Sequence, residues 1–296
     1  MTTAALEGEW EQHRSAVFGV AYRLLGGVAD AEDVVQDVWL RASAADLSAV
    51  RDLRAWLVTI AARTSYNILK SARVRRESYV GPWLPEPLLT GPDAAESVLV
   101  DESVSTAMLI VMEELTPPER VAFVLHDVFE VPFELIAEVV DRSPAATRKL
   151  ASRARQRVAE ARERPPVPRA QRDRVLAAFR AATEAGDLDA LIGVLHPEAV
   201  YIADGGGKVL AARKLVRGAA RVAALLANVG RRRIGRADEG DVGRVEIVEV
   251  NGEPGLVSYD PSGELLWIDT FEIVDGRVLT MWRQSNPEKL RHIGHT

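Results

Sequence analysis

Residues 131–161 decide the fold of the central part of this chain; they read VPFELIAEVV (131–140), DRSPA (141–145) and ATRKLASRARQRVAEA (146–161). The first segment has the apolar spacing of a short helix, the second is a tight turn, and the third is a longer basic helix. Ser143 is a natural N-cap, and Pro144 suits the first helical position, where no backbone N–H is needed. This order of elements predicts a helix-turn-helix motif.

The second helix of such a motif enters the major groove of DNA, and its N-terminal half faces the base edges. Donor side chains occupy the positions where that role requires them: Arg148, Lys149, Ser152, Arg153 and Arg155. A surface helix rich in arginine for solubility is the alternative. Acidic residues are almost absent from the first half of the helix, which favours DNA binding.

The net charge of −6 does not argue against a nucleic-acid partner once it is resolved along the chain. Residues 51–77 hold seven Lys or Arg against two acids, and residues 141–164 hold eight against three. Phosphate is bound by a local basic surface rather than by the total charge. Two basic clusters, each in a helical pattern, are therefore candidate nucleic-acid surfaces.

Bulk composition excludes several classes of protein. A chain of 296 residues with 47% hydrophobic residues is expected to form two or three domains, each with its own core. No apolar run approaches the ~20 residues of a membrane span, and the first residues lack a signal-peptide layout, so we expect a cytoplasmic chain without membrane contact. The absence of Cys and five scattered His predict no metal site, no catalytic histidine and no cofactor.

The N-terminal part, residues 8–79, reads as helix with brief interruptions, the first at Gly26 and Gly27. A second helix starts near Asp30, which can act as its N-cap. This helix has one apolar face and one polar face, and the polar face holds Asp33, Gln36, Asp37 and Arg41. Periodicity alone indicates a solvated surface there.

A third helix, from about Leu53 to Arg76, combines an apolar side with a basic one. Two aromatic residues that we expect to be exposed, Tyr66 and Tyr79, are close to the basic side. The residues that we assign to this surface are Arg63, Tyr66, Asn67, Lys70, Arg73, Arg75 and Arg76. The proline-rich residues 80–100 then form a linker, in which Trp83 and Leu84 indicate docking.

Four segments, taken in order, resemble domains two and four of bacterial sigma factors of the extracytoplasmic-function (ECF) type: AYRLL (21–25), DAEDVVQDVWLR (30–41), RAWLVTIAAR (54–63) and LTPPERVAFVL (115–125). The resemblance implies sigma domain two at residues 8–79 and sigma domain four at residues 101–164, with core RNA polymerase and promoter DNA as partners. One departure is Leu150, which stands where relatives often carry a basic residue, so no promoter sequence carries over.

The resemblance also assigns roles to the three surfaces. The polymerase-binding residues would be Asp30, Asp33, Gln36, Asp37 and Arg41. The basic third helix would hold the promoter −10 element, and the helix-turn-helix would read the −35 element.

The C-terminal part, residues 171–290 after a linker at 165–170, has a different character. Helices are expected at about 169–185, 186–197 and 216–228, with a short extended segment at 200–203; four strands follow at 244–250, 255–259, 265–274 and 278–284. Asn251-Gly252 and Asp275-Gly276 are hairpin signals. The pattern predicts an α+β domain with a curved antiparallel sheet.

AGDLDAL (185–191) and LHPEAV (195–200), with the final strands, resemble the SnoaL-like cone-shaped barrel. That resemblance implies a pocket and leaves room for an unidentified small-molecule ligand. Some relatives are isomerases or cyclases that use carboxylates, and a cavity here would be lined by Tyr201, Asp204, Trp267, Asp269 and Trp282. An exposed turn aspartate and packed aromatic residues explain the same residues, so we expect no enzyme and no catalytic residue.

Three further motifs, WLPEP (83–87), DGGGK (204–208) and NPEKL (286–290), together resemble the sigma subgroup with a SnoaL-like extension. We interpret DGGGK as a turn whose glycines adopt positive φ rather than as a phosphate loop. The resemblance implies that the extension replaces a separate anti-sigma partner and acts in cis. The expected interdomain contacts are Trp83, Leu84, Pro85, Asp204, Lys208, Asn286 and Pro287.

Two other functions remain open at this point. A ligand-responsive helix-turn-helix repressor explains the basic helix and the pocket but leaves the acidic polar face at residues 30–41 unexplained. A SnoaL-type isomerase or cyclase fused to a DNA-binding module predicts turnover that depends on Asp204 or Asp269.

Overall fold

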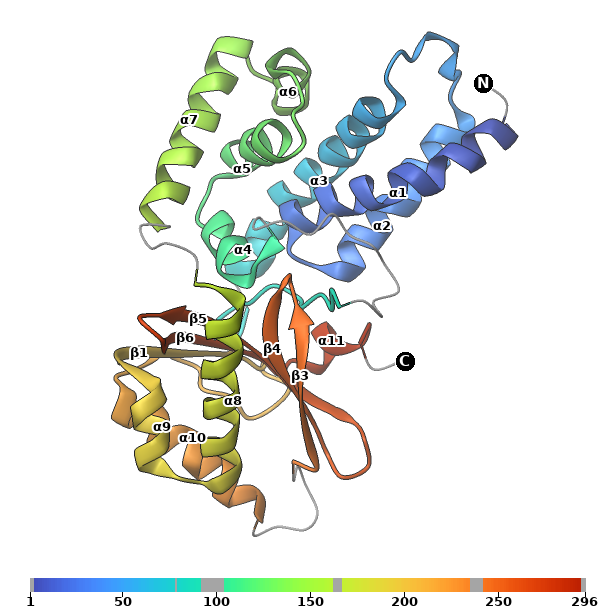
Figure 1. Cartoon of the computed structure of the whole chain (residues 1–296). Helices are drawn as coiled ribbons and strands as arrows, with labels where there is room; N and C mark the ends of the chain where they lie inside the picture. The colour runs from blue at the N-terminus through green and yellow to red at the C-terminus, as the bar shows by residue number, and fades with distance from the viewer. Residues whose placement is uncertain (1–2, 78, 92–103, 162–166, 235–241, 294–296) are drawn as a thin grey trace. The chain divides into compact units, whose positions relative to one another are not determined.

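The computed structural model describes residues 3–77, 79–91, 104–161, 167–234 and 242–293, with the backbone alone for 3–7, 72–77 and 228–234. The chain divides into two compact units. Unit 1 comprises residues 1–78 and 92–163, and unit 2 comprises residues 79–91 and 164–296. Figure 1 shows the helices of unit 1 in blue to green and the sheet of unit 2 in yellow to red. The proline-rich segment 79–91 thus belongs to the C-terminal unit.

Unit 1 begins with three helices, α1 (Thr3–Leu25), α2 (Val28–Ala44) and α3 (Leu53–Glu77), and a short 3-10 turn, η1 (Leu47–Ala49), before α3. Helix α1 packs against both α2 and α3. Gly26, with φ +70°, makes the break between α1 and α2. The N-cap of α2 is Gly27, so the expectation that Asp30 caps the helix is wrong. Asp30 lies in the first turn instead, where the helix dipole favours a negative charge.

The second part of unit 1 contains α4 (Thr106–Glu113), α5 (Pro117–Phe123), the π-helical turn η3 (Val124–Val128), α6 (Phe133–Val140) and α7 (Pro144–Ala161). Asp141 ends α6 in the left-handed conformation, with φ 53°. The Ser143 hydroxyl accepts a hydrogen bond from the backbone N–H of Ala146 at 3.2 Å, which caps the start of α7. The predicted helix-turn-helix is therefore present.

Glu119 ties the start of α5 to α7. Its carboxylate accepts hydrogen bonds from the backbone N–H (3.1 Å) and the hydroxyl (2.7 Å) of Thr116, and from Arg157 of α7 at 3.0 Å. Burial opposes the charge of Glu119, but the hydrogen bonds from Thr116 and the charge of Arg157 outweigh it and lower the pKa of this carboxyl.

We expect Glu119→Gln to reduce the free energy of unfolding of unit 1 by about 1 kcal/mol at neutral pH, because a cap and an ion pair are lost. The native pKa is lowered, so the contribution is present above the unfolded value of about 4.3 and disappears as the pH falls through the folded pKa. Urea unfolding of the helical signal at several pH values measures this. A difference from wild type that does not shrink in acid, or an equal effect of the exposed neighbour Glu114→Gln, would contradict it.

Unit 2 contains, in chain order, α8 (Arg169–Ala185), α9 (Leu188–Val194), β1 (Leu195–Asp204), β2 (Val216–Arg217), α10 (Ala219–Ile234), β3 (Arg244–Val250), β4 (Glu253–Tyr259), β5 (Leu265–Val274), β6 (Arg277–Gln284) and α11 (Pro287–Leu290). The sheet order is β2-β1-β6-β5-β4-β3. Strands β1 and β6 run parallel and all other pairs are antiparallel. The four predicted strands, β3 to β6, pair antiparallel as expected. The sequence analysis did not predict β1 as a strand of this sheet; it pairs parallel with β6 because α10 and the β3–β6 meander carry the chain back to β1 by a crossover.

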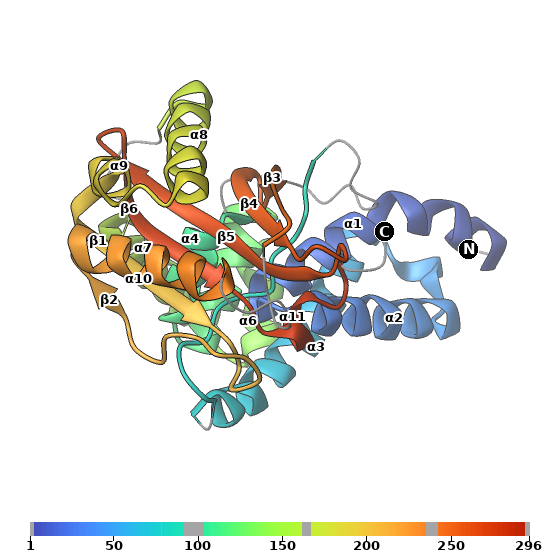
Figure 2. The same cartoon turned by 90° about the horizontal axis from the view of Figure 1, so that it is seen from below.

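The two faces of the sheet have different covers. Helices α8, α9 and α10 lie over one face (Figure 2), where Leu176, Phe179, Leu191, Val222 and Met281 are core residues. A smaller cluster on the sheet includes Leu290 and Ile293 from the C-terminal segment, with Leu89 packed against it. The hairpins at Asn251-Gly252 and Asp275-Gly276 have positive φ at both residues, as their sequences predict.

Candidate functional sites

The polar face of α2 is the first candidate site. Asp30, Asp33 and Gln36 are exposed. Asp37 is held by Arg41, at 3.0 Å, and by the hydroxyl of Thr64, which donates at 3.1 Å. The sequence analysis did not select Leu40, whose exposed fraction of 65% is unusual for a leucine. Its position four residues after Gln36 places it on the same face, where an apolar side chain could have been noticed.

The basic side of α3 is the second candidate. Arg63, Asn67 and Lys70 are exposed and follow one another at i, i+4 and i+7, so they form one stripe. The expectation of an exposed Tyr66 is wrong: its exposed fraction is 6%, and the Lys70 ammonium lies 3.9 Å from its ring centroid. The side chains of Arg73, Arg75 and Arg76 lie outside the described ones, and the half-buried Tyr79 belongs to unit 2.

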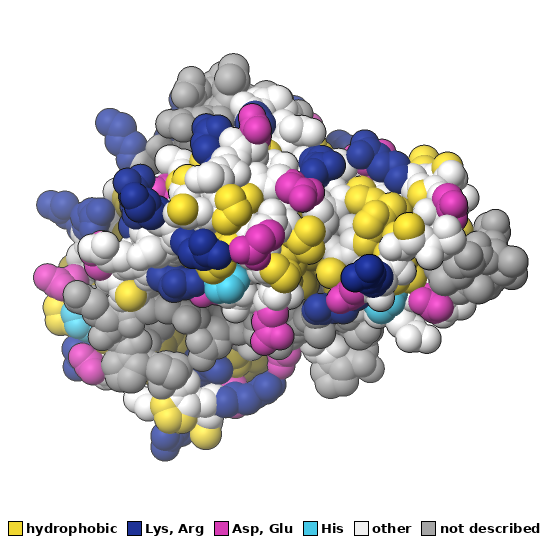
Figure 3. All heavy atoms as spheres, turned by 90° about the horizontal axis from the view of Figure 1, so that it is seen from above, with side chains coloured by type: hydrophobic (Ala, Val, Ile, Leu, Met, Phe, Trp, Pro, Cys, Tyr) yellow, Lys and Arg dark blue, Asp and Glu magenta, His cyan; other side chains and the backbone are white. Residues whose placement is uncertain are grey.

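The outer face of α7 is the third candidate. Its inner face buries Thr147, Ala151, Ala154 and Val158. The five residues predicted to contact DNA, Arg148, Lys149, Ser152, Arg153 and Arg155, are all exposed. Two of them are oriented by ion pairs, Arg148 with Glu134 at 3.0 Å and Arg155 with Asp127 at 2.6 Å. In Figure 3, Lys and Arg side chains gather on the left of the face that is shown.

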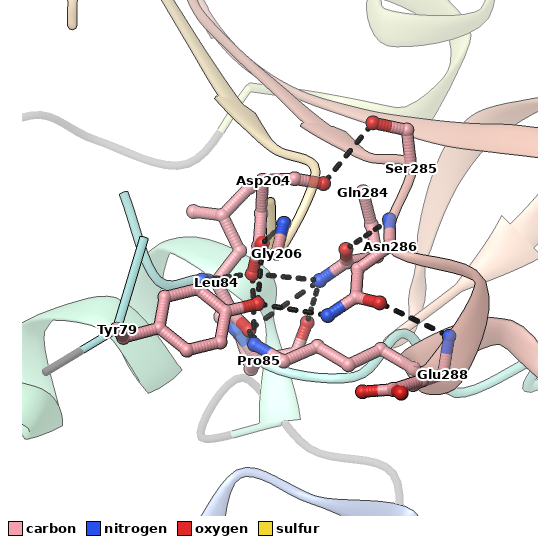
Figure 4. A network of polar contacts seen from close by, with 10 residues as sticks. Tyr79, Leu84, Pro85, Asp204, Gly206, Gln284, Ser285, Asn286 and Glu288 are labelled. Atoms are coloured by element: carbon pink, nitrogen blue, oxygen red, sulfur yellow. Dashed lines mark hydrogen bonds and ion pairs between the residues drawn. The ribbon is translucent and has the colours of Figure 1, made fainter. Parts of the chain in front are cut away.

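A buried carboxylate in unit 2 is the fourth candidate site (Figure 4). Asp204, the last residue of β1, has no exposed surface, so its interpretation as an exposed turn residue is wrong. One oxygen accepts hydrogen bonds from the Tyr79 hydroxyl (2.6 Å) and the backbone N–H of Gly206 (3.0 Å). The other accepts from the backbone N–H of Leu84 (2.9 Å), the Lys289 ammonium (2.8 Å) and the Gln284 amide (3.3 Å).

The partners of Asp204 also bind one another. Lys289 donates to the carbonyl of Leu84 at 2.6 Å, and its ammonium lies 4.2 Å from the ring centroid of Trp83 and 4.9 Å from that of Tyr79. The Asn286 amide donates to the Tyr79 hydroxyl at 2.9 Å. We call the group of Tyr79, Leu84, Asp204, Asn286 and Lys289 the Asp204 clasp. It joins the proline-rich segment, the end of β1 and helix α11.

The hydroxyl of Tyr79 remains a donor over the working pH range of the protein. Burial raises the pKa of Tyr79, and the hydrogen bond to Asp204 raises it further. The buried ion pair of Asp204 and Lys289 is saturated with additional hydrogen bonds, which is the condition for a stable charge pair away from water.

The proline-rich segment continues along the edge of the sheet. The backbone N–H of Thr90 donates to the carbonyl of Glu249 at 3.0 Å, and that of Asn251 donates to the carbonyl of Leu88 at 2.7 Å. His292 Nε2 lies 2.8 Å from the carbonyl oxygen of Pro87. Residues 79–90 are therefore attached to unit 2 along most of their length.

The predicted interdomain residues differ in their actual roles. Trp83, Leu84, Asp204 and Asn286 are in or against the clasp, and the Pro85 carbonyl lies 3.4 Å from the Gln284 amide. Lys208 instead forms an exposed ion pair with Glu288 at 2.9 Å, and Pro287 is an exposed first residue of α11. The sequence analysis did not assign Tyr79, Gln284 or Lys289 to this site. Of the three, only Lys289 could have been predicted, because it follows Asn286 by three residues on a short helix and so lies on the same side.

The glycines of DGGGK adopt the positive φ that the sequence predicts, 57° at Gly206 and 72° at Gly207. A Cβ atom at Gly206 would clash with the side chain of Asn286. Glycine is thus required here both by its backbone conformation and by the close approach of the C-terminal segment.

A cavity of about 360 Å³ lies between the helices and the sheet of unit 2, lined by Phe179, Leu226, Leu256 and Trp267 among others. Both oxygens of Asp269 in its wall accept hydrogen bonds from Arg283, at 2.7 and 2.8 Å. Burial alone would lower the pKa of Arg283, but the negative charge and hydrogen bonds of Asp269 have the larger effect and raise it. The Asp269 carboxylate is thus held in a buried ion pair with Arg283. The described residues contain no cluster of metal ligands and no helix long and apolar enough to cross a membrane.

Comparisons with known proteins agree with this geometry. Residues 10–75 match the family Sigma-70 region 2, and residues 107–158 match Sigma-70, region 4. The chain is 40% identical to the ECF RNA polymerase sigma factor SigJ of Mycobacterium tuberculosis over 95% of this chain and 92% of SigJ. This chain belongs to the ECF sigma factors.

Two more comparisons show which parts of this chain resemble other sigma factors. The probable ECF RNA polymerase sigma factor SigI of M. tuberculosis is 37% identical over 64% of this chain and 66% of SigI. The crystal structure of M. tuberculosis SigJ superposes with a TM-score of 0.77 and 37% identity, covering 96% of this chain and 98% of that one. Helices α1–α3 form region 2, α4–α7 form region 4, and unit 2 is an α+β extension that the superposition with SigJ also covers.

We expect Lys289→Met to lower the free energy of unfolding of unit 2 by about 3–5 kcal/mol, because it leaves the Asp204 carboxylate buried without its cation. Asp204→Asn combined with Lys289→Met should recover part of this loss. Urea unfolding followed by tryptophan fluorescence measures both. The matched control is Lys208→Met, whose exposed pair is worth less than about 1 kcal/mol; equal effects of the two lysine variants would contradict the clasp.

Proposed function

We propose that this sigma factor binds core RNA polymerase through the polar face of α2, holds the −10 element with the basic stripe of α3, and reads the −35 element with α7. We further propose that unit 2 controls these activities in cis through the Asp204 clasp. A protein with these partners acts in the cytoplasm, and we assign this chain to that compartment. The clasp, which attaches the segment between regions 2 and 4 to the C-terminal extension, carries the proposal.

The exposed face of α2 supports polymerase docking. Three exposed polar residues, Asp30, Asp33 and Gln36, stand beside the exposed Leu40, so the face combines charge with an apolar contact. Interfaces with this combination use charge for orientation and the buried apolar group for affinity.

We expect Asp33→Ala combined with Leu40→Ala to weaken binding of the full chain to core polymerase at least tenfold, since both side chains are free to reach a partner. Fluorescence anisotropy of the labelled chain with core enzyme measures it. Glu9→Ala combined with Glu11→Ala, at exposed acids of α1, is the control; it removes two negative charges, whereas the test variant removes one. Loss of affinity in the control alone would place the polymerase site elsewhere.

The outer face of α7 supports sequence reading. Its exposed hydrogen-bond donors lie in the part of a recognition helix that faces base edges. Arginines nearer the C-terminal end of α7 would contact phosphates and fix the position of the helix on the DNA. Arg148 and Arg155 would exchange their exposed acidic partners, Glu134 and Asp127, for DNA. Exposed ion pairs of this kind are weak enough to be exchanged at little cost.

The contact between regions 2 and 4 within unit 1 supports control by the linker. Helix α3 packs against α5 and α6, and Arg120 donates to the carbonyl of Leu24 at 2.9 Å. Elements at −10 and −35 are about 25 base pairs apart, or roughly 85 Å at 3.4 Å per base pair. Regions 2 and 4 therefore have to separate when both elements are bound.

The linker limits that separation. The 26 residues from 78 to 103 could span at most about 90 Å when fully extended. With residues 79–91 attached to unit 2, the 12 residues that follow Gly91 could extend to only about 43 Å. A closed clasp thus shortens the tether between the two DNA-binding modules, and its opening would restore the reach.

Run-off transcription by core polymerase tests the proposed function, with the wild-type chain, Lys289→Met and the control Lys208→Met on promoters selected from a random library. We expect initiation only when the chain is present, and a change of at least threefold in Lys289→Met alone. Equal activity of all three chains would contradict control by the clasp. Tight operator binding without any initiation would instead support a repressor.

The cavity of unit 2 is proposed to have no catalytic role, because both carboxylates of its lining are in ion pairs, Asp269 with Arg283 and Glu184 with Arg180. Arg283→Lys and Asp269→Asn are expected to alter stability without abolishing any turnover that the chain shows.

A further inference from the structure

Residues 205–237 of unit 2 hold nine Lys or Arg and no acidic residue. Residues 165–296 as a whole carry 18 basic and 18 acidic residues, so half of their cations fall in a quarter of their length. This segment lies outside the two basic clusters of regions 2 and 4, and the sigma function described above assigns no role to its arginines.

Of the described cations of this segment, Lys208 pairs with Glu288 at 2.9 Å, and the other four are directed to solvent. Arg213, Lys214, Arg217 and Arg221 are all exposed. None of the four forms an ion pair with a described acidic residue, and the same holds for Arg277 at the start of β6. Other cations of unit 2 are paired, as Arg172 with Glu253 and Arg244 with Glu246 show. The side chains of Arg231, Arg232, Arg233 and Arg236 lie outside the described ones.

Three of these arginines line one open hollow of about 510 Å³. Arg217 comes from β2, Arg221 from α10 and Arg277 from β6. The remaining lining consists of residues 218–220 with Ile192, Leu195 and Pro197, and none of it is acidic. Figure 2 shows α9, β1, β2 and α10, which form this part of the unit, side by side. We call this surface the arginine hollow.

Three guanidinium groups without acidic partners repel one another, and an anion between them would remove that repulsion. Guanidinium groups match phosphate oxygens with paired hydrogen bonds and are more weakly hydrated than ammonium groups, so phosphate is the anion that they fit best. Two further exposed cations, Arg213 and Lys214, lie in the loop before β2. Several exposed cations on one unit suit a chain of phosphates better than a single phosphate.

We propose that the arginine hollow binds the phosphate backbone of duplex DNA, as a third DNA contact in addition to α3 and α7. This inference rests on the proposed function, which brings the chain to a promoter. The hollow presents arginines and small or apolar residues, without a helix that could enter a groove, so its contact is independent of base sequence. Its role is to add affinity and salt dependence to promoter binding rather than specificity.

The salt dependence of DNA binding tests this proposal. The full chain and the variant Arg217→Ala/Arg221→Ala/Arg277→Ala are titrated against a short duplex without promoter elements, by fluorescence anisotropy between about 50 and 200 mM salt. Three phosphate contacts contribute a slope of about −2.7 to log K against log salt, so over this range wild type should lose about 40-fold more affinity than the variant. The control of equal charge is Arg169→Ala/Arg174→Ala/Arg291→Ala, at exposed positions of the same unit.

A slope in the hollow variant equal to that of the control would overturn the proposal. A second result would also overturn it: calorimetry shows that wild type binds inorganic pyrophosphate and the hollow variant does not, while the salt dependence of DNA binding is the same in both. The hollow would then hold a small phosphate ligand. Run-off transcription at low salt distinguishes failure of this proposal from failure of the proposed sigma function. Failure of the wild-type chain to initiate counts against the sigma role, whereas the slope on promoter-free DNA tests the hollow alone.

Discussion

The buried carboxylate of Asp204 is the constraint on which the C-terminal half of the structure depends. A carboxylate without exposed surface is tolerated only when charges and donors surround it, and here a lysine, a tyrosine, a glutamine amide and two backbone N–H groups do so. These donors come from three segments that are far apart in sequence. One charge therefore holds the proline-rich segment and the C-terminal helix α11 against the end of β1.

In this arrangement, the binding faces and the segment that joins them belong to different units of the chain. Regions 2 and 4 carry the faces proposed for polymerase and DNA, and in both the helix that carries such a face is held by a buried inner side. The segment that joins them is folded with the extension instead. Under the proposed function, control acts on the reach of the tether, without a ligand at any of the three exposed faces, when the clasp is open in one functional state and closed in the other.

Much of this structure follows from local sequence, and the rest depends on contacts between distant residues. Ser143 with Pro144 marks the start of α7, and Asn251-Gly252 and Asp275-Gly276 mark hairpins, because each signal is satisfied within a few residues. The parallel pairing of β1 with β6 and the burial of Tyr66 depend on packing that no local pattern contains. Asp204 shows the difference most clearly: DGGGK predicts its turn, but Tyr79 and Lys289, 125 and 85 residues away, decide its burial.

Hydrogen–deuterium exchange of residues 79–91 tests the central claim, that the clasp controls the sigma factor in cis, most directly. The account predicts slow exchange at the amides of Leu84 and Thr90 in the free chain, because both are hydrogen-bonded to unit 2. In an initiation complex with core polymerase and promoter DNA, the same amides should exchange much faster, while those of β5 and β6 stay protected. Equal protection of Leu84 and Thr90 in the free chain and in an active complex would contradict the account.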